Sequence, residues 1–282
     1  MKDIKILSWN IGNCVYSDYY CVKDRQDSLH FKNMFPAKRK EVFLNLSGIV
    51  GTIKEVNPDI VLLQEVTKIS PLNRFVNTYK RLKSNLDEYY SYYLKHYNIL
   101  GFINHGKAVF TKELANYSDI KIPVKMKSLK DDIFLGNKTV IKTSININSS
   151  NLVIFNVHFA AFSRNELERL EQLRYILELA RLELANGHDV IIGGDFNMDL
   201  DIDSLSSDMM DEIKSSGFNF IVSSTPTLRS LSSPYSENSN KRTIDGFLCS
   251  SNIEMIDITN LDTFKHSDHS PIVLNFRIRE RK

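Results

Sequence analysis

Apolar and polar positions follow one another along the chain in a way that predicts strands separated by helices. Residues 3–9 alternate in polarity, which is typical of a strand. Between residues 37 and 57, apolar side chains recur every three or four positions, which predicts a helix. Pro58 should end this helix, because the residue before a proline avoids the helical region. The apolar run at 60–63 then predicts a buried strand.

The same alternation continues to the end of the chain. Ser163 and Glu166 have the spacing of a capping box, and the helical pattern that follows them should end at Gly187. Residues 14–36 have no period and predict a long surface loop. Shorter helices are expected at 74–86 and 200–216, and further strands at 107–111, 139–147, 152–159, 190–192 and 272–278.

Neither an internal repeat nor a low-complexity linker interrupts this pattern. A chain of 282 residues can bury a sizeable core. We therefore expect a single domain over residues 1–282, with two β-rich halves covered by helices. Such a pattern favours a layered α/β architecture.

The composition is that of an ordinary globular protein, with 42% hydrophobic and 25% charged residues. The net charge is only +2, and basic residues gather in two short clusters, at 38–40 and 277–282. We interpret these clusters as a solvated helix start and a solvated chain end. The charge balance permits a polyanionic substrate without requiring one, since dedicated nucleic-acid binders usually carry a clustered basic face.

The cysteines and the N-terminal sequence pattern indicate in which cellular compartment the protein is expected. Cys14, Cys21 and Cys249 lack metal-type spacing, so reduced thiols in the cytoplasm are expected. A Cys14–Cys21 pair in an exported protein is the alternative. The first residues form no apolar leader, and no run of 18 apolar residues occurs, so neither a signal peptide nor a transmembrane segment is expected. No obligate protein partner is evident.

Four short segments have an apolar strand that ends in polar side chains: Trp9-Asn10, Gln64-Glu65, Asn156-Val157-His158 and Gly194-Asp195-Phe196-Asn197. Two more segments with candidate polar side chains follow, Ile244-Asp245 and Ser267-Asp268-His269. Strand ends are where α/β folds assemble their sites, so we expect these side chains to lie close together.

Together these side chains suit the hydrolysis of a phosphate ester. Mg²⁺ prefers oxygen ligands, which Glu65, Asn10 and Asp268 offer. A general base near neutral pH is available in His269, and a carboxylate such as Asp245 can fix its tautomer. His158 and Asn197 are suitable donors to the phosphoryl oxygens.

In this order, the six segments resemble the endonuclease/exonuclease/phosphatase superfamily, which includes deoxyribonuclease I, the apurinic/apyrimidinic endonucleases, neutral sphingomyelinases and inositol polyphosphate 5-phosphatases. The resemblance runs from Trp9 to Pro271. It implies a deoxyribonuclease I-like, four-layer α/β sandwich, in which two packed mixed β-sheets are flanked by helices. It also implies a hydrolase of phosphate ester bonds with Mg²⁺ or Mn²⁺ as cofactor.

The resemblance also implies roles for individual residues. Glu65, helped by Asn10, would be the main metal site, and Asp268 a metal ligand or a carboxylate on the phosphate side. Asp195 would orient the attacking water, and either Asp195 or His269 would be the base. Asn197 and His158 would bind phosphate oxygens.

Two of the assignments have structural alternatives. His158 lies inside an apolar run and suits a buried structural histidine as well as a phosphate ligand. Arg229 is a candidate phosphate clamp, because a guanidinium matches phosphate geometry, and equally a candidate for a structural ion pair.

Within the superfamily, the chain is most similar to a bacterial branch without a defined substrate. The supporting stretches are Trp9-Asn10-Ile11-Gly12, His158-Phe159-Ala160-Ala161-Phe162 and Thr225-Pro226-Thr227-Leu228-Arg229. Gly12 stands where the apurinic/apyrimidinic endonucleases carry an acidic residue, and Gly246 stands where nucleases carry an aromatic one. Both departures argue against a direct transfer of the DNA-repair role.

Three functions follow as hypotheses. The first is a phosphodiesterase acting on nucleic acid. The second is the same chemistry on a phosphoinositide, sphingomyelin or another small phosphate, and the third is a catalytically inactive binding module. The aromatic residues Tyr16, Tyr19, Tyr20 and Phe31 suit stacking on bases, or packing within their own loop.

Overall fold

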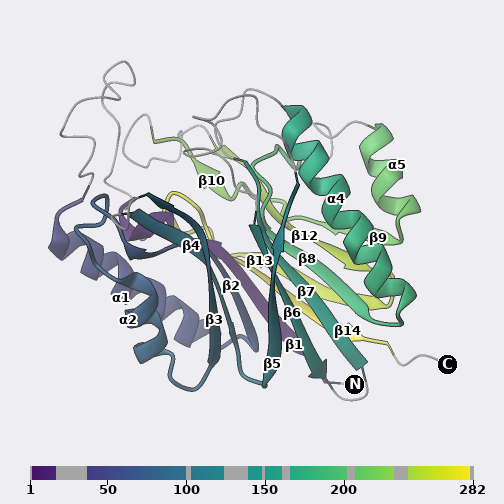
Figure 1. The fold of residues 1–282 in the computed structure, drawn as a ribbon, viewed down its shortest axis with the longest axis horizontal. Helices are drawn as coiled ribbons and strands as arrows, with labels where there is room; N and C mark the ends of the chain where they lie inside the picture. Colours follow the sequence, from purple (N-terminus) through teal and green to yellow (C-terminus); the bar gives the residue numbers. More distant parts are fainter. Residues whose placement is uncertain are drawn as a thin grey trace.

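The computed structural model describes residues 2–16, 37–99, 103–123, 139–147, 150–160, 166–201, 207–231 and 241–279. Two six-stranded sheets pack face to face, with helices on the outer face of each (Figure 1). This is the four-layer α/β sandwich that the resemblance implied.

The first sheet has the strand order β13-β14-β1-β2-β4-β3. Its strands are β1 (Ile4–Asn10), β2 (Ile60–Ile69), β3 (Tyr90–Ile99), β4 (Ile103–Thr111), β13 (Ile253–Asn260) and β14 (Ile272–Ile278). The helices α1 (Arg39–Val56) and α2 (Thr78–Asn85) cover its outer face.

The second sheet has the order β5-β6-β7-β8-β12-β9. Its strands are β5 (Ala115–Lys121), β6 (Thr139–Ile147), β7 (Ser150–His158), β8 (Asp189–Asp195), β9 (Phe218–Ile221) and β12 (Asp245–Ser250). The helices α4 (Glu166–Ala185) and α5 (Ser207–Ser215) cover it. A 3-10 turn η1 (Gly12–Cys14) and a small ribbon of β10 (Leu228–Arg229) and β11 (Lys241–Arg242) complete the described elements.

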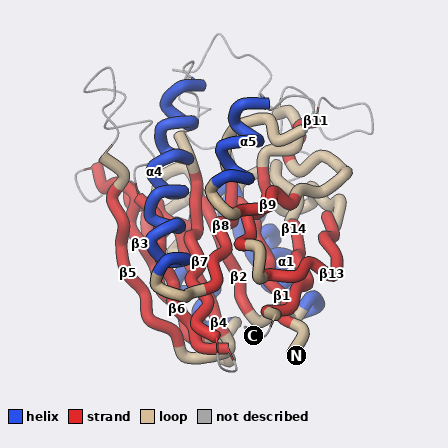
Figure 2. The backbone as a smooth tube through the Cα atoms, turned by 90° about the vertical axis from the view of Figure 1, so that its right-hand side faces the viewer, coloured by secondary structure: helices blue, strands red, loops and turns tan. Residues whose placement is uncertain are grey.

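Each sheet contains one parallel pair, β1 with β2 and β7 with β8, among antiparallel neighbours. Parallel neighbours need a crossover connection, which α1 provides in the first sheet and α4 in the second. The carboxyl ends of these four strands therefore lie at one edge of the sandwich, which we call the carboxyl edge (Figure 2).

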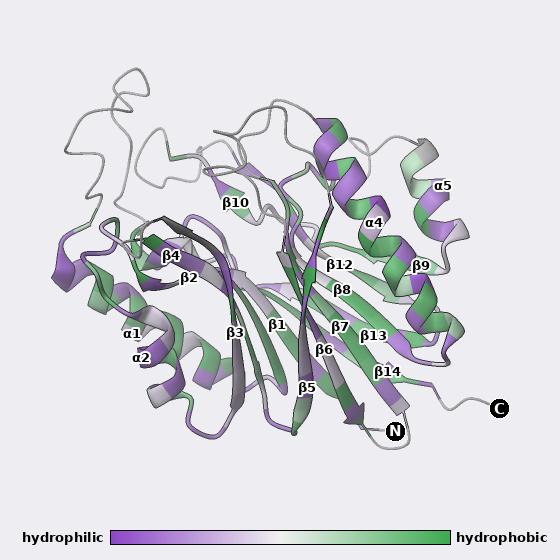
Figure 3. Cartoon of the chain, viewed as in Figure 1, coloured by the Kyte–Doolittle hydropathy of each residue, from purple (hydrophilic) through white to green (hydrophobic). Residues whose placement is uncertain are grey.

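The central strands are buried on both faces, which explains why the sequence shows them as nearly continuous apolar runs. Between the sheets, Ile6 and Leu62 pack against Ile154 and Ile191. The outward-facing residues of the same strands pack against the apolar stripes of α1 and α4. Figure 3 shows these strands as mainly hydrophobic, whereas the helices carry hydrophilic residues as well.

The predicted elements agree with the structure except at several boundaries. Residues 74–77 are not helical: Arg74 and Phe75 have φ angles of 58° and 59°, and α2 begins after Asn77, whose side chain accepts a hydrogen bond from the Lys80 amide. The expected helix at 200–216 begins only at Ser207. The predicted strand at 60–63 extends to Ile69.

Some predictions fall on residues outside the described part of the chain. These are the Ser163 cap, most of the 14–36 loop, Cys21 and the aromatic residues Tyr19, Tyr20 and Phe31. Cys14 and Cys249 are buried thiols. Among the described helices, none has the length and apolar character needed to cross a bilayer.

Candidate active site

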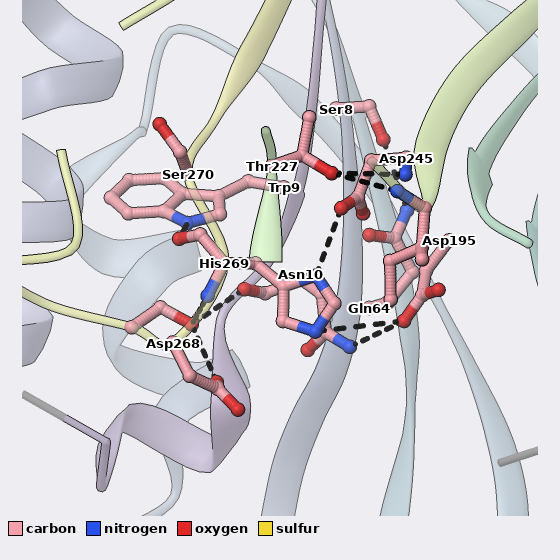
Figure 4. A network of polar contacts seen from close by, with 12 residues as sticks. Ser8, Trp9, Asn10, Gln64, Asp195, Thr227, Asp245, Asp268, His269 and Ser270 are labelled. Atoms are coloured by element: carbon pink, nitrogen blue, oxygen red, sulfur yellow. Dashed lines mark hydrogen bonds and ion pairs between the residues drawn. The ribbon is translucent and has the colours of Figure 1, made fainter. Parts of the chain in front are cut away.

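A buried polar cluster occupies the carboxyl edge between the two sheets (Figure 4). Strand pairing brings its members together: His158 at the end of β7 lies opposite Asp195 at the end of β8, which lies opposite Asp245 at the start of β12. From the other sheet, Asn10 at the end of β1 donates to Asp195 Oδ2 at 2.9 Å. Side chains from both sheets therefore converge on Asp195.

Glu65 reaches the cluster through a β-bulge in β2. The pairing of β2 with β4 shifts between Leu63 and Val66, so Gln64 and Glu65 together oppose Lys107. Glu65 has a φ of 52°, in the left-handed region. A bulge re-aims side chains, and here Gln64 donates to Asn156 between the sheets while Glu65 accepts from Asn10 and Asn13.

Asp195 ends β8, and the glycine before it has no room for a side chain beside β7. Gly194 has a φ of 145°, and a Cβ there would lie 2.1 Å from the carbonyl oxygen of Val157. After the strand, the Asn197 amide donates to Asp195 Oδ1 at 2.8 Å, and Asn197 Nδ2 donates to the Phe159 carbonyl at 3.0 Å. The Asp195 carboxylate is 1% exposed and fixed at both oxygens.

His269 and Asp245 form a carboxylate–imidazole pair. The distance from His269 Nδ1 to Asp245 Oδ2 is 2.9 Å. Trp9 Nε1 donates to the backbone oxygen of His269 at 2.8 Å, and the Asp245 amide donates to Thr227 Oγ1. The second imidazole nitrogen, Nε2, lies 3.8 Å from Asp195 Oδ2. The ring is therefore oriented with one nitrogen toward each carboxylate.

His158 approaches the same carboxylate from the second sheet, with 3.5 Å between its Nε2 and Asp195 Oδ2. Burial lowers the pKa of His158 to about 3, so its imidazole is neutral at neutral pH. Burial also acts to lower the pKa of His269, but the carboxylates of Asp245 and Asp195 outweigh it and raise that pKa to about 10. The two histidines of the cluster thus differ in charge.

Glu65 and Asp268 form a second pair of neighbouring carboxylates. Asn13 Nδ2 donates to Glu65 Oε2 at 2.7 Å, and Ser267 Oγ lies 3.3 Å from Asp268 Oδ1. Burial, and then the charge of Asp268, raise the pKa of Glu65 to about 7. Burial also raises the pKa of Asp268. A divalent cation would relieve this unfavourable burial of like charges.

Gly12 leaves room for Asp268. Its φ is 48°, and a Cβ at this position would lie 2.9 Å from Asp268 Oδ1. The Gly12 amide donates to Asn10 Oδ1 at 3.1 Å. The absence of an acidic side chain at residue 12 is therefore built into the packing of this turn.

The described residues offer two settings for a cation. Asp195, Asp245 and His269 can each present one ligand atom, with all three atoms within 4.8 Å of one another. In that group, however, Asp245 already accepts a hydrogen bond from His269. Glu65 and Asp268 offer carboxylate oxygens, which better suit Mg²⁺ or Mn²⁺, and Asn10 lies beside them with its Nδ2 toward Glu65 and its Oδ1 toward the Gly12 amide.

Arg229, the candidate phosphate clamp, is only 1% exposed. Its backbone amide donates to the Asp268 carbonyl and its Nη1 to the Ser230 carbonyl. The structure brings it beside Asp268, and the clamp role stays a prediction. Tyr16 lies against Gly12, at the start of the expected aromatic loop.

Sequence reasoning missed three residues of the cluster. Asn13 binds Glu65, and Ser267 Oγ donates to the Asn10 carbonyl at 2.7 Å. Lys107 is buried opposite the bulge, and its Nζ donates to the Thr139 carbonyl at 2.7 Å. The short spacing between Asn10 and Asn13 could have identified Asn13 from the sequence. The position of Lys107 beside the cluster depends on the bulge in β2, which the sequence pattern does not reveal.

Comparison with known proteins places this arrangement in context. The chain is similar in structure to an endonuclease/exonuclease/phosphatase from Beutenbergia cavernae DSM 12333 (TM-score 0.72, 17% identity, covering 99% of this chain and 72% of that one). It is also similar to an endonuclease/exonuclease/phosphatase family protein from Leptotrichia buccalis C-1013-b (TM-score 0.68, 17% identity, covering 98% of this chain and 100% of that one). A third similar structure is the human Nocturnin catalytic domain (TM-score 0.62, 19% identity, covering 98% of this chain and 94% of that one). A comparison with curated proteins finds no match.

The model of the Endonuclease/Exonuclease/phosphatase family matches residues 7–269, which include every residue of the polar cluster. Members of this family hydrolyse phosphate esters and generally use a divalent metal. The chain therefore belongs to the endonuclease/exonuclease/phosphatase family and is a hydrolase of phosphate ester bonds.

Proposed function

We propose that this chain is a divalent-metal-dependent phosphodiesterase that acts on nucleic acid through attack of an activated water. One observation carries the proposal: Asp195 Oδ2 lies within 4 Å of nitrogen atoms of Asn10, His158 and His269 in one buried cluster. Such a convergence of an anchored carboxylate with an Asp–His pair is suited to general acid–base chemistry at a phosphate.

Glu65, Asn10 and Asp268 would hold the Mg²⁺ or Mn²⁺ ion. When bound, such a cation neutralises charge that develops on the phosphoryl oxygens. The raised pKa values of Glu65 and Asp268 support this assignment, because they mark carboxylates whose charges lack compensation in the protein alone.

The remaining side chains act on the water and on the phosphate. Asp195 orients the attacking water, and Asp245 keeps His269 in the correct orientation for proton transfer. Asp195 removes the proton, because the raised pKa of His269 keeps its imidazole protonated near neutral pH. His158 and the second N–H of Asn197 Nδ2 donate hydrogen bonds to non-bridging oxygens.

An anion in this fold has a precedent: the similar catalytic domain of human Nocturnin was solved with a bound sulfate anion. A tetrahedral dianion resembles a phosphate group in shape and charge. This supports an oxyanion substrate here. The same cluster suits a phosphoinositide, sphingomyelin or another small phosphate, so the substrate is decided by experiment.

The test measures hydrolysis of a substrate panel with Mg²⁺ and with chelator. The panel contains plasmid DNA, single-stranded DNA, RNA, an inositol phosphate, sphingomyelin and bis-p-nitrophenyl phosphate. The variants are His269→Ala and Asp195→Asn. His188→Ala is the matched control, since His188 pairs with Glu183 in the turn after α4.

Metal-dependent cleavage of nucleic acid that disappears in both site variants and persists in His188→Ala is the expected result. Cleavage of only the inositol phosphate or the lipid would overturn the choice of substrate. Hydrolysis of nothing in the panel would overturn the proposed function and favour a binding module.

A further inference from the structure

The two sides of the carboxyl edge differ in charge. On the side of α1 and α2, residues 37–43 and 70–83 contain seven basic residues and one acidic residue, Glu41. The basic residues are Lys38, Arg39, Lys40, Arg74, Lys80, Arg81 and Lys83. On the opposite side, the first turn of α4 carries Glu166 and Glu168 with one basic residue, Arg169. A polyanion that enters the site is therefore attracted toward α1 and α2.

Several of these basic residues are organised into one surface, which we call the basic rim: Arg39, Phe43, Arg74, Phe75 and Arg81. Arg39 and Arg81 both lie over the Phe43 ring, with 5.8 Å and 4.4 Å from each guanidinium carbon to the ring centroid. Arg74 Nε donates to the Ala37 carbonyl at 3.0 Å, which ties the 70–77 turn to the start of α1. Guanidinium groups from three segments are thus held side by side.

The turn after β2 presents an aromatic ring to solvent. Phe75 is 52% exposed, although phenylalanine is usually buried. Arg74 and Phe75 both have left-handed φ angles, a conformation that costs free energy in residues other than glycine. The Phe75 amide donates to the Ser70 carbonyl, and Asn73 Nδ2 donates to the Val76 carbonyl. These contacts fix the turn and hold the Phe75 ring on the surface.

The basic rim is joined directly to the candidate active site. Asn13 bonds to both Glu65 and Thr67, and the Thr67 amide donates to Thr78 Oγ1 at the start of α2. β2 itself runs from Glu65 to the turn. Five residues of extended chain span about 17 Å. A stretch of this length can be followed by several nucleotides of a single strand.

We propose that the basic rim binds the backbone and bases of a single-stranded nucleic acid that extends from the active site over α1 and α2. The arginines contact phosphates, whose geometry matches a guanidinium fork, and Phe75 stacks on an unpaired base. A lipid head group or a small phosphate is too short to reach from Glu65 to Phe75. The proposal rests on the proposed function and names its substrate class.

The experiment compares three variants. Arg39→Gln/Arg81→Gln removes two guanidinium groups from the basic rim, and Phe75→Ala removes the ring. Lys54→Gln/Lys214→Gln is the matched control, since it removes two positive charges from the last turns of α1 and α5, away from the carboxyl edge. Each variant is assayed on single-stranded DNA and on bis-p-nitrophenyl phosphate, which is too small to reach the basic rim.

For the double arginine variant, the ratio of kcat/KM on DNA to kcat/KM on the small diester should fall about tenfold. The slope of log KM for DNA against log salt should fall by about 0.7 for each phosphate that the variant no longer binds. Phe75→Ala should lower the same ratio at least ~5-fold and leave the salt slope unchanged, because stacking releases no counterions. The control should match wild type.

Binding is measured separately by fluorescence anisotropy of labelled single-stranded DNA, in a His269→Ala background. Weaker binding in both rim variants supports the inference even where turnover is slow. Wild-type DNA affinity in the rim variants, or an equal loss in the lysine control, would overturn it. If wild type cleaves DNA and the rim variants behave like it, only this inference fails. If wild type hydrolyses nothing in the panel, the proposed function fails first.

Discussion

Asp245 acts on the reaction through His269 rather than on the substrate, and this relation can be tested at the scale of one residue. In Asp245→Asn, the amide would replace the carboxylate that accepts from His269 Nδ1 at 2.9 Å. The imidazole would lose its preferred orientation, and kcat should fall by about 10²–10⁴-fold. Steady-state kinetics at saturating substrate, with circular dichroism to verify folding, measure this. Turnover within a factor of two of wild type would refute the role.

Lys107 gives a second prediction at this scale, concerning stability. The side chain is 1% exposed, and burial lowers its pKa from 10.5 to about 7. Between pH 7 and 10 the unfolded chain then binds a proton that the folded protein does not, so the lysine's destabilising effect diminishes as pH rises. Lys107→Met should therefore be more stable than wild type near pH 7.

The measurement is denaturant unfolding of both proteins from pH 7 to 9.5. The advantage of Lys107→Met should shrink by up to about 1.4 kcal/mol per pH unit as pH rises. Parallel stability curves would contradict the prediction. Lys142→Met, which changes a partly exposed lysine paired with Glu183, serves as the control.

The candidate residues themselves were largely predictable from the sequence, because each follows or precedes an apolar strand. Asn10, Asp195 and His158 lie in one cluster as expected. Asn13 and Lys107 were not identified, since their places depend on a 3-10 turn and on a bulge that leave no periodic signal. The burial of Arg229 was equally invisible, because its backbone pairs with Asp268, a residue far along the chain.

At the scale of elements, the close approach of β8 to β7 depends on Gly194. An alanine there would place its Cβ 2.1 Å from the Val157 carbonyl oxygen and adopt an unfavourable φ of 145°. Gly194→Ala should lower the free energy of unfolding by about 3 kcal/mol or more. Urea denaturation measures the change.

Gly51 in α1 is the matched control, because nothing lies within 4 Å of a Cβ built there. Gly51→Ala should raise stability by about 0.5–1 kcal/mol, since alanine has the higher helix propensity. Similar effects from both substitutions would show that the contact with Val157 is not decisive.

Periodicity identified α1, α4 and the central strands because their apolar residues face one or two packed layers. It failed at the start of α2, where the apolar spacing continues through Arg74 and Phe75 but the backbone turns left-handed. Propensity carries little information on such a turn, since its conformation is fixed by contacts to Ser70 and Ala37.

At the scale of the whole molecule, the order β13-β14-β1-β2-β4-β3 could not be derived from hydrophobic patterns. The two edge strands of that sheet, β13 and β3, come from parts of the chain that are far apart in the sequence. The resemblance to a known family supplied the four-layer architecture with two mixed sheets, and the order of the strands comes from the structure.

Metal binding should stabilise the whole fold, because a ligand that binds only the folded state shifts the unfolding equilibrium. At a Mg²⁺ concentration of about 100 times Kd, the gain is about 2.7 kcal/mol. Thermal unfolding with MgCl₂, against NaCl of equal ionic strength, measures it. Glu65→Gln should abolish most of the shift in Tm. An undiminished shift in that variant would place the ion elsewhere.

Both ends of the described chain leave the sandwich far from the carboxyl edge. β1 begins at Ile4, which pairs with Phe276 near the end of β14, and Ile4 lies at the opposite end of β1 from Asn10 of the candidate active site. The protein can therefore be immobilised on a bead or a sensor chip through either end, with every molecule presenting its reactive side to the flowing solution. A tether at either end would not shield the basic rim from long nucleic acids.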